Sequence, residues 1–167
     1  MGIVERDFDA EDLHPIDIVE SLASERSWDF DRIADDQIAM AIEGSWRTYS
    51  VTLAWHAHDE TLRLICAFEM APPVRRLSAL NATICLANDR CWSGAFVLWR
   101  DQKLMGFRYS LNLAGGAHAS SAQINDMVRA AVMACERFYP MFQLVVWGGE
   151  SPEKALGIAI SEAYGRA

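Results

Sequence analysis

The sequence lacks the patterns by which membrane and secreted proteins are recognised. Nowhere among its 167 residues does an apolar run approach the roughly 20 residues that a membrane-spanning helix needs. Residues 1–11 are acidic and have no apolar core of the kind found in a secretory signal. The four cysteines never occur as Cys-x-x-Cys, and so few in a chain of this length argue against a disulfide framework. We therefore expect free, buried thiols and a cytoplasmic protein.

Motifs for nucleotide binding and for acyl transfer are also absent. The glycine pairs Gly115-Gly116 and Gly148-Gly149 fall in neither the dinucleotide-binding pattern nor the P-loop pattern, and no G-x-S-x-G elbow occurs. We expect the first pair to close a sheet and the second to end a helix. Asp35-Asp36 is interpreted as a turn before a strand and not as a carboxylate pair for acid/base work. We predict no catalytic residues and no cofactor.

Positive charge is scarce in the first third of the chain. Residues 1–43 contain 13 acidic and 3 basic side chains, whereas residues 44–167 contain 10 acidic and 12 basic ones, and the net charge is −8. An acidic amino-terminal third repels phosphate groups, and Arg75-Arg76 is the only basic pair that could offset it. The charge distribution therefore disfavours nucleic acid as a partner.

Helix start signals are present along the whole chain. His14 followed by Pro15 predicts a helix to about residue 26, because proline suits the first helical position and the residue before it can cap the helix. Pro72-Pro73 predicts a second helix that reaches about residue 88. A last helix is expected at 152–163.

The stretch from residue 121 to residue 147 predicts a long, buried helix. Ser120 and Gln123 form a capping-box pattern at its start. Pro140 lies inside the apolar run and has no backbone N–H to donate, so we expect it to kink or break the helix. The aromatic segment around Pro140 carries no group suited to catalysis, which favours a structural role.

Alternation of apolar and polar side chains predicts five strands. Within residues 46–56, for example, Tyr49, Val51 and Leu53 share one face of the strand. The other strands are expected at 37–42, 61–68, 95–99 and 104–113. The predicted fold is α+β, with the order α-β-β-β-α-β-β-α-α and a five-stranded antiparallel sheet packed with helices. One domain is expected over residues 13–167, after a flexible acidic segment at 1–12.

The second face of the predicted sheet is unusually apolar for a face in contact with water. A sheet with helices on one side normally shows a polar other side. We expect this face to be covered by the helix at 73–88, by a second copy of the chain or by another protein. The candidate interaction surface comprises Trp46, Ile65, Val97, Trp99, Leu104, Leu77 and Leu86.

The cluster that most resembles a set of metal ligands is His56-Ala57-His58, followed by Asp59-Glu60. Alternation along a strand would place both imidazoles on the same face. Polar residues are expected in any case where a hairpin turns, so we predict no metal site. The alternative hypothesis is a small metal-dependent or ligand-binding enzyme centred on His56 and His58.

A series of short signals across most of the chain resembles the YbjN family. The signals are, in order, His14-Pro15, Gly44-Ser45-Trp46, Tyr49, Cys66-Ala67-Phe68, Asn88, Gly94, Phe96, Leu98-Trp99, Arg108, Cys135-Glu136-Arg137-Phe138-Tyr139-Pro140, Val146-Trp147-Gly148-Gly149 and the closing residues 163–167. Each is weak alone, but their order makes the resemblance specific. Only the acidic first dozen residues fall outside it.

The resemblance implies the fold of type III secretion chaperones, with the order α-β-β-β-α-β-β-α, an antiparallel sheet and a tendency to homodimerise. It also implies regulation through protein contacts, without enzymatic activity or a cofactor. We therefore predict a non-enzymatic, regulatory or chaperone-like domain that acts as a homodimer and binds a protein partner. A structural subunit of a larger complex is a further interpretation. The resemblance transfers no site residues, and a shared fold does not establish a shared function.

Overall fold

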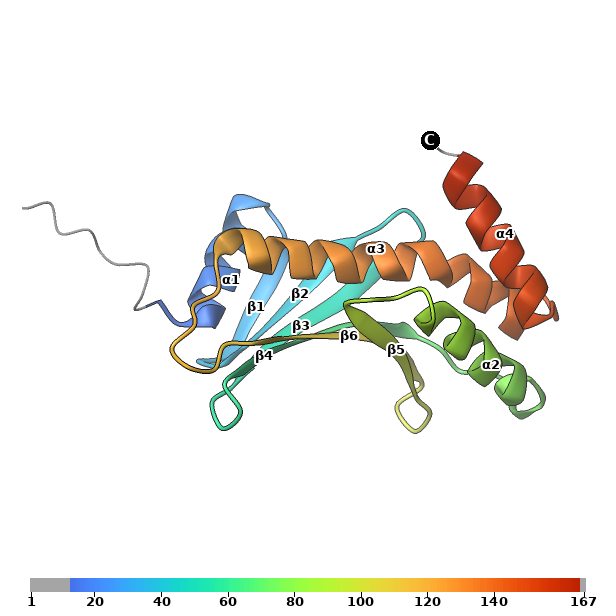
Figure 1. Cartoon of the computed structure of the whole chain (residues 1–167), viewed down its shortest axis with the longest axis horizontal. Coiled ribbons are helices and arrows are strands. Elements are labelled where there is room, and N and C mark those ends of the chain that lie inside the picture. Colours follow the sequence, from blue (N-terminus) through green and yellow to red (C-terminus); the bar gives the residue numbers. More distant parts are fainter. Residues whose placement is uncertain (1–12, 166–167) are drawn as a thin grey trace, which may run out of the picture.

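The computed structural model describes residues 13–165 of the chain, with side chains as far as residue 161. The expected acidic segment at 1–12 lies outside the described residues. The elements form an α+β fold built on one antiparallel sheet (Figure 1). No helix between residues 13 and 165 has both the length and the apolar character needed to cross a bilayer.

The sheet has six strands in the order β1-β2-β3-β4-β6-β5. The strands are β1 (Asp29–Ala34), β2 (Gln37–Glu43), β3 (Thr48–His56), β4 (Thr61–Glu69), β5 (Gly94–Trp99) and β6 (Leu104–Asn112), and the helices are α1 (Pro15–Glu25), α2 (Leu77–Asn88), α3 (Ser121–Val146) and α4 (Pro152–Gly165). The sequence-based count of five strands is therefore one too few, although the fold class is confirmed.

The strand that the sequence pattern missed is β1, which forms one edge of the sheet. Asp29 and Asp31 alternate in it with Phe30 and Arg32, so it has the charge content of a loop. Charged side chains are tolerated there because an edge strand pairs on one side only. Arg32 donates to Asp17 at 3.0 Å and to Glu20 on α1 at 2.8 Å, which fixes the strand against the first helix.

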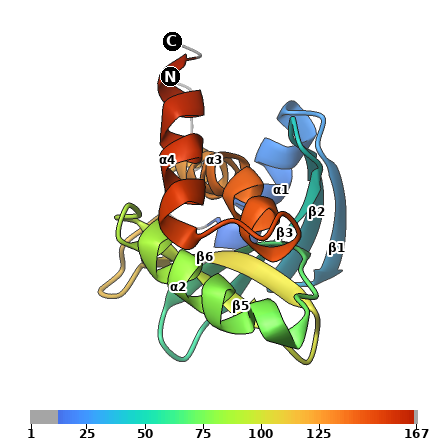
Figure 2. The same cartoon turned by 90° about the vertical axis from the view of Figure 1, so that its right-hand side faces the viewer.

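All helices of the described chain lie on one side of the sheet or beyond its end. α3 runs along the sheet, and α1 lies beside α3 near β1 (Figure 1). At the other end α2 packs against α3 and β5, and α4 packs against α2 and α3. The sheet curves around α3 (Figure 2), so the core lies between them. The expectation that the helix at 73–88 covers the second sheet face is wrong, because α2 packs against α3, α4 and β5 instead.

The ends of the helices follow the expected chemistry. The His14 ring nitrogen Nδ1 accepts the backbone N–H of Ile16 at 3.2 Å. Ser120 and Gln123 form a complete capping box at the start of α3. α3 runs for 26 residues through Pro140 without a break, and its last turns bend towards α2 (Figure 1). Packing on the core therefore offsets the hydrogen bond that proline cannot make.

The cysteines are only partly as expected. Cys66 and Cys135 are fully buried between β4 and α3, with their sulfur atoms 3.6 Å apart. Cys91 is partly buried, whereas Cys85 on α2 is exposed. The expectation of buried thiols fails at Cys85, because α2 presents that side chain to solvent and not to α3.

Candidate protein-interaction surface

The sheet face that points away from α3 carries the apolar residues that define the candidate surface. We call it the open face. Strand pairing places Trp99 opposite Leu104 and Val97 opposite Gly106 on this face. Ile65 lies on the same face, opposite Arg108. The four apolar side chains are all partly exposed. The structure thus brings together four of the seven residues proposed from sequence, namely Ile65, Val97, Trp99 and Leu104.

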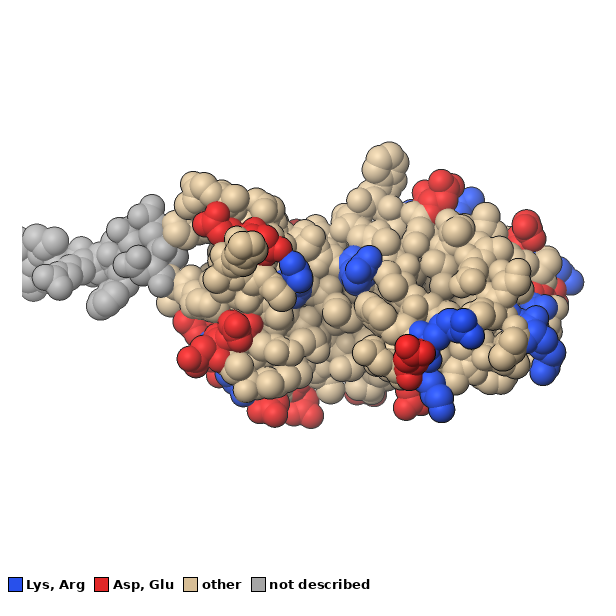
Figure 3. All heavy atoms as spheres, turned by 90° about the horizontal axis from the view of Figure 1, so that it is seen from below, with Lys and Arg blue, Asp and Glu red and all other residues tan. Residues whose placement is uncertain are grey.

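The rest of the open face consists largely of small side chains. These residues are Ala39, Ala41, Ser50, Thr52, Ala54, Ala67 and Ala95. Figure 3 looks onto this face and shows a broad neutral area, with acidic side chains at the α1 and β1 end and basic side chains towards the α2 end. Side chains this short let another polypeptide approach the sheet closely.

A hollow of about 640 Å³ lies on the open face over β4, β6 and β5. We call it the β4–β6 groove. Its apolar wall is formed by Trp99 and Ile65. A Cβ atom built on Gly106 would lie 2.5 Å from the Trp99 ring and 3.3 Å from Ile65, so the indole rests on the bare backbone of Gly106. The glycine therefore allows the tryptophan to lie flat on the sheet.

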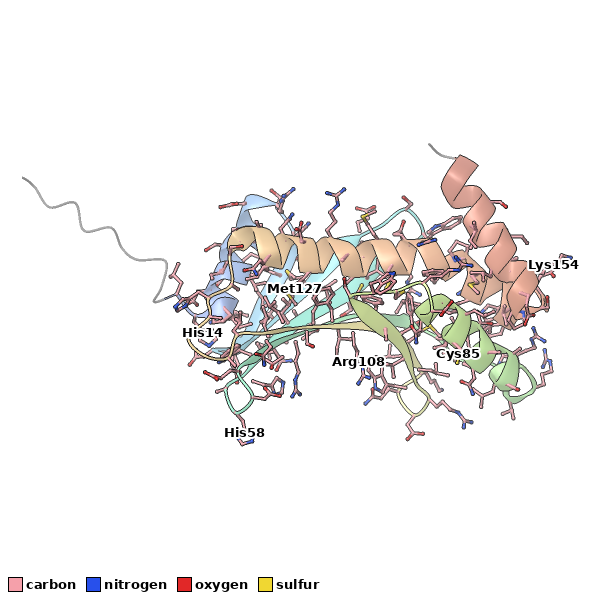
Figure 4. The ribbon with its side chains drawn as sticks, viewed as in Figure 1. His14, His58, Cys85, Arg108, Met127 and Lys154 are labelled. Carbon is pink, nitrogen blue, oxygen red and sulfur yellow. The ribbon has the colours of Figure 1, made fainter. Side chains whose placement is uncertain are left out.

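Two arginines border the β4–β6 groove, and sequence reasoning assigned neither of them a role. Arg63 donates to the Asp59 carboxylate at 2.5 Å, and this hydrogen bond holds the pKa of Asp59 below its usual value. Arg108 is exposed and forms no salt bridge with any residue that the structure describes. Figure 4 shows Arg108 extending from the sheet away from α3. Their positions on one strand face, among small residues, are the signal that could have identified them.

The other three residues proposed from sequence lie elsewhere. Trp46 precedes β3 in the β2–β3 turn, and its side chain lines hollows beside Tyr139 and Pro140 of α3. Leu77 and Leu86 are partly buried on α2, where Leu86 packs against the core. The seven residues therefore do not form a single surface. Leu77 and Leu86 lie on α2, and Trp46 belongs to the turn and not to the strand on which alternation had placed it.

The β2–β3 turn is attached to α3 by one carboxylate. Glu136 accepts the backbone N–H of Ser45 at 2.8 Å, the N–H of Trp46 at 3.3 Å and the Tyr49 hydroxyl at 2.6 Å. Burial and the neighbouring carboxylate of Glu136 raise the pKa of Tyr49 above its ordinary value. A side chain on Gly44 would collide with the same carboxylate. Several of the residues that carry the family resemblance therefore meet where Glu136 attaches the β2–β3 turn to α3, which we call the Glu136 contact.

The helix side of the molecule has a second exposed apolar area, which we call the helix-side patch. It includes Trp46, Trp92 and Met133, and Trp92 is 98% exposed. A hollow of about 460 Å³ lies among these three residues, bordered by Arg90 and Arg137. Exposed tryptophan beside arginine is typical of protein-binding hot spots.

The histidine cluster is exposed and lies where β3 turns into β4. His56 is the last residue of β3, and His58 lies in the turn that follows, so the two imidazoles are not aligned on a strand as alternation implied. Within residues 13–161, no three His, Cys, Asp or Glu side chains are arranged to hold a metal ion.

Two of the thiols, those of Cys91 and Cys135, have a raised pKa. Burial raises the pKa of Cys91, and the nearby Arg137 offsets this only in part. The contact with Cys66, together with burial, raises the pKa of Cys135. A raised pKa leaves less of the reactive thiolate at neutral pH. The raised pKa values therefore disfavour a nucleophilic role for Cys91 and Cys135.

Two solved structures are similar to this fold. One is the crystal structure of YbjN, described as "a putative transcription regulator from E. coli", with a TM-score of 0.54 and 12% identity over 75% of this chain and 92% of that chain. The other is the HopA1-SchA chaperone-effector complex, with a TM-score of 0.51 and 15% identity over 73% of this chain and 89% of that one. At these identities the similarity shows the fold alone. No curated protein matches the sequence.

The family assignment comes from a profile comparison. Residues 15–144 match the profile of the YbjN family, whose description reads "putative bacterial sensory transduction regulator". The matched region begins at α1 and ends within α3, and so it includes the whole sheet. This chain belongs to the YbjN family.

Proposed function

We propose that this chain is a non-enzymatic, cytoplasmic protein-interaction domain that acts as a homodimer and binds an extended segment of a protein partner. Regulatory or chaperone-like action follows from that contact. The observation that carries the proposal is the open face, which has four partly exposed apolar side chains. Two of them, Ile65 and Trp99, line a groove of about 640 Å³ that no described helix covers. Apolar areas of this kind, with a polar rim, mark protein-binding sites.

The chemistry of the open face suits an extended chain. Small side chains such as Ala41, Ser50 and Ala67 leave room for a backbone to lie across the strands. Trp99 offers a rigid aromatic surface, and Arg108 can pair with a carboxylate of the partner. The family description as a regulator and the fold shared with one member of a chaperone-effector complex agree with this role, but the latter is an analogy at the level of fold.

The proposed homodimer is assigned to the helix-side patch, which leaves the open face free for the partner. The support for this assignment is the near-complete exposure of Trp92 beside Met133. Sedimentation of Trp92→Ala should show monomers at concentrations where the unmodified chain and Trp99→Ala are dimers. If the unmodified chain sediments as a monomer, the proposed homodimer is wrong. If Trp99→Ala dissociates the dimer and Trp92→Ala does not, the dimer interface lies on the open face instead.

Partner binding is tested with a photo-crosslinking amino acid in place of Thr52, which pairs with Ile65 on the open face. The control carries it at Arg129, which is exposed on α3. Crosslinks formed in the native cell at Thr52 and not at Arg129 identify the partner by mass spectrometry. Binding of the purified partner should then weaken about 30-fold in Trp99→Ala, as expected for a hot spot worth about 2 kcal/mol. Equal crosslinking at both positions, or unchanged affinity, refutes the assignment of the open face.

A further inference from the structure

A single row of paired residues crosses the open face from one edge of the sheet to the other. From β1 to β5, strand pairing aligns Asp31, Ala39, Thr52, Ile65, Arg108 and Ala95. The row has a carboxylate at the β1 edge, a guanidinium group on β6 and only uncharged side chains between them. The open face therefore carries opposite charges at the two ends of one line.

The neighbouring row repeats the carboxylate and adds an apolar surface near the guanidinium group. It aligns Asp29, Ala41, Ser50, Ala67, Gly106 and Val97. The Trp99 ring rests on Gly106 and lies beside Ile65. We call the two rows together the cross-strand lane. Along it, two aspartates come first, then small side chains, then the apolar pair Ile65 and Trp99, and then Arg108.

The charged groups of the cross-strand lane are accessible to a partner. Asp29, Asp31 and Arg108 are exposed, and none of them forms a salt bridge within residues 13–161. Arg63, in contrast, is paired with Asp59. A carboxylate of a partner therefore finds its guanidinium group at Arg108, and a basic side chain finds its carboxylates at the β1 edge.

The shape of the sheet favours an extended segment over a second copy of the chain as the occupant. A second copy turned end to end would also place acidic groups over basic ones. However, the sheet curves around α3, so the open face is convex (Figure 2). Two convex faces touch over a narrow strip and hold their charged margins apart, whereas an extended segment can follow the curve from one margin to the other.

The spacing of the strands sets the pattern of side chains that the segment needs. Neighbouring strands lie about 4.8 Å apart, so Ile65 is about 14 Å and Arg108 about 19 Å from Asp31 along the row. At about 3.3 Å per residue, these distances correspond to roughly four and six residues of an extended segment. Residues separated by an even number share one face of such a segment, so all three contacts can form at once.

We propose that an extended segment of the partner crosses the strands along the cross-strand lane, with a basic and an acidic residue six positions apart. The basic side chain lies over Asp29 and Asp31. The carboxylate pairs with Arg108, and a large apolar side chain two residues from it packs against Ile65 and Trp99. The spacing is the same for either direction of the segment. This inference rests on the proposed function and adds the chemistry of the partner to it.

The first test selects random dodecapeptides, displayed on phage, against the immobilised full chain. Enriched peptides should carry the basic and acidic residues six positions apart, with the large apolar residue two positions from the acidic one. The matched protein carries Asp29→Arg, Asp31→Arg and Arg108→Asp, and it should instead enrich peptides whose apolar residue lies two positions from the basic one. Enrichment without this spacing, or the same peptides from both proteins, overturns the proposal.

The second test measures the affinities of two labelled synthetic peptides by fluorescence anisotropy. GRASAFAEG has the proposed spacing, and GEASAFARG has the same composition with its charges exchanged. The first should bind roughly tenfold more tightly, because the exchange turns two exposed attractions into repulsions. Arg108→Glu should remove this difference, and Arg129→Glu on α3 should preserve it. Equal binding of both peptides, or binding of neither, overturns the proposal.

These measurements separate a failure of this inference from a failure of the proposed function. If Trp99→Ala abolishes binding of the selected peptides while Asp31→Arg and Arg108→Glu do not weaken it, the charge pattern is wrong and the open face remains the binding site. If none of the three variants matters and Thr52 gives no crosslinks, the proposed function fails as well. If Asp31→Arg or Arg108→Glu turns a dimer into monomers in sedimentation, the occupant is a second copy and this inference is refuted.

Discussion

The two faces of the sheet differ sharply although the same strands supply both. On β4, Leu64 is 1% exposed beneath α3. The next residue, Ile65, is partly exposed on the open face. Successive side chains of a strand point to opposite faces, so a step of one residue moves from the core to the binding surface. Stability and binding are therefore assigned to alternate residues, and substitutions can separate them.

The largest expected effect comes from comparing these two neighbours. Leu64→Ala should lower the free energy of unfolding by about 2–5 kcal/mol, because it leaves a cavity between β4 and α3. Ile65→Ala should cost clearly less, because the side chain is only partly removed from water. Urea unfolding followed by circular dichroism measures both values. Equal losses in the two variants would show that the open face is covered in solution, and a concentration-dependent loss in Ile65→Ala would identify a second copy as the cover.

A second comparison concerns Arg75 and Arg76, which lie in the turn just before α2. Arg76 donates from Nε to the carbonyl oxygen of Val145 at 2.8 Å and from Nη2 to that of Glu150 at 2.9 Å, whereas Arg75 is exposed. Arg76→Met should lower the free energy of unfolding by about 1.5–3 kcal/mol, because one carbonyl at the end of α3 and one in the loop before α4 lose their charged donor. Arg75→Met is the control and should match the unmodified chain in the same urea titration. A similar loss in both variants would mean that the charge near α2, and not the two hydrogen bonds, supports the helix end.

The hydrogen bond between Tyr49 and Glu136 predicts that the free energy of unfolding depends on pH in the alkaline range. The pKa of Tyr49 is raised above its ordinary value of 10.0 by burial and by Glu136. Above pH 10 the unfolded chain loses this proton while the folded chain keeps it, so the free energy of unfolding falls as pH rises. Tyr49→Phe should cost about 1 kcal/mol at pH 7 and make the alkaline fall less steep. Tyr109→Phe is the control, because Tyr109 lies on β6 and forms no hydrogen bond with Glu136 among the described residues. An equal change of slope in both variants contradicts the assignment to Tyr49.

The sequence was sufficient for most of the fold because its signals are local. The Ser120 capping box and the alternation of β3 each depend on a few neighbouring residues, and both are confirmed. β1 was missed because Asp29 and Asp31 give it a loop-like composition that only its position at the sheet edge explains. Pro140 was expected to kink or break α3. The helix does not break, because burial on the core offsets the missing hydrogen bond, but its last turns bend towards α2 (Figure 1).

The candidate surface was only partly predictable for a related reason. Alternation placed Ile65, Val97 and Trp99 on one face, and they do lie there. Trp46 was assigned to the same face by counting back from β3, but the turn directs it towards α3. Arg108 was recognised as a family signal without a role, because its position between Ile65 and Ala95 depends on the pairing of β6 with β4 and β5. Pairing between strands is not visible in either strand alone.

The smallest expected effect on stability sharpens the distinction between the two faces. The hydrogen bond from Arg63 lowers the pKa of Asp59, so this pair contributes above the ordinary pKa of 3.8 and its contribution is lost as the pH falls below that value. Both side chains are exposed, and exposed pairs of this kind contribute little. Asp59→Asn should therefore leave the urea midpoint at pH 7 unchanged. The control Glu60→Gln, which changes a neighbouring charge without touching Arg63, should give the same midpoint. A midpoint lowered in Asp59→Asn alone would show that the open face contributes to stability after all.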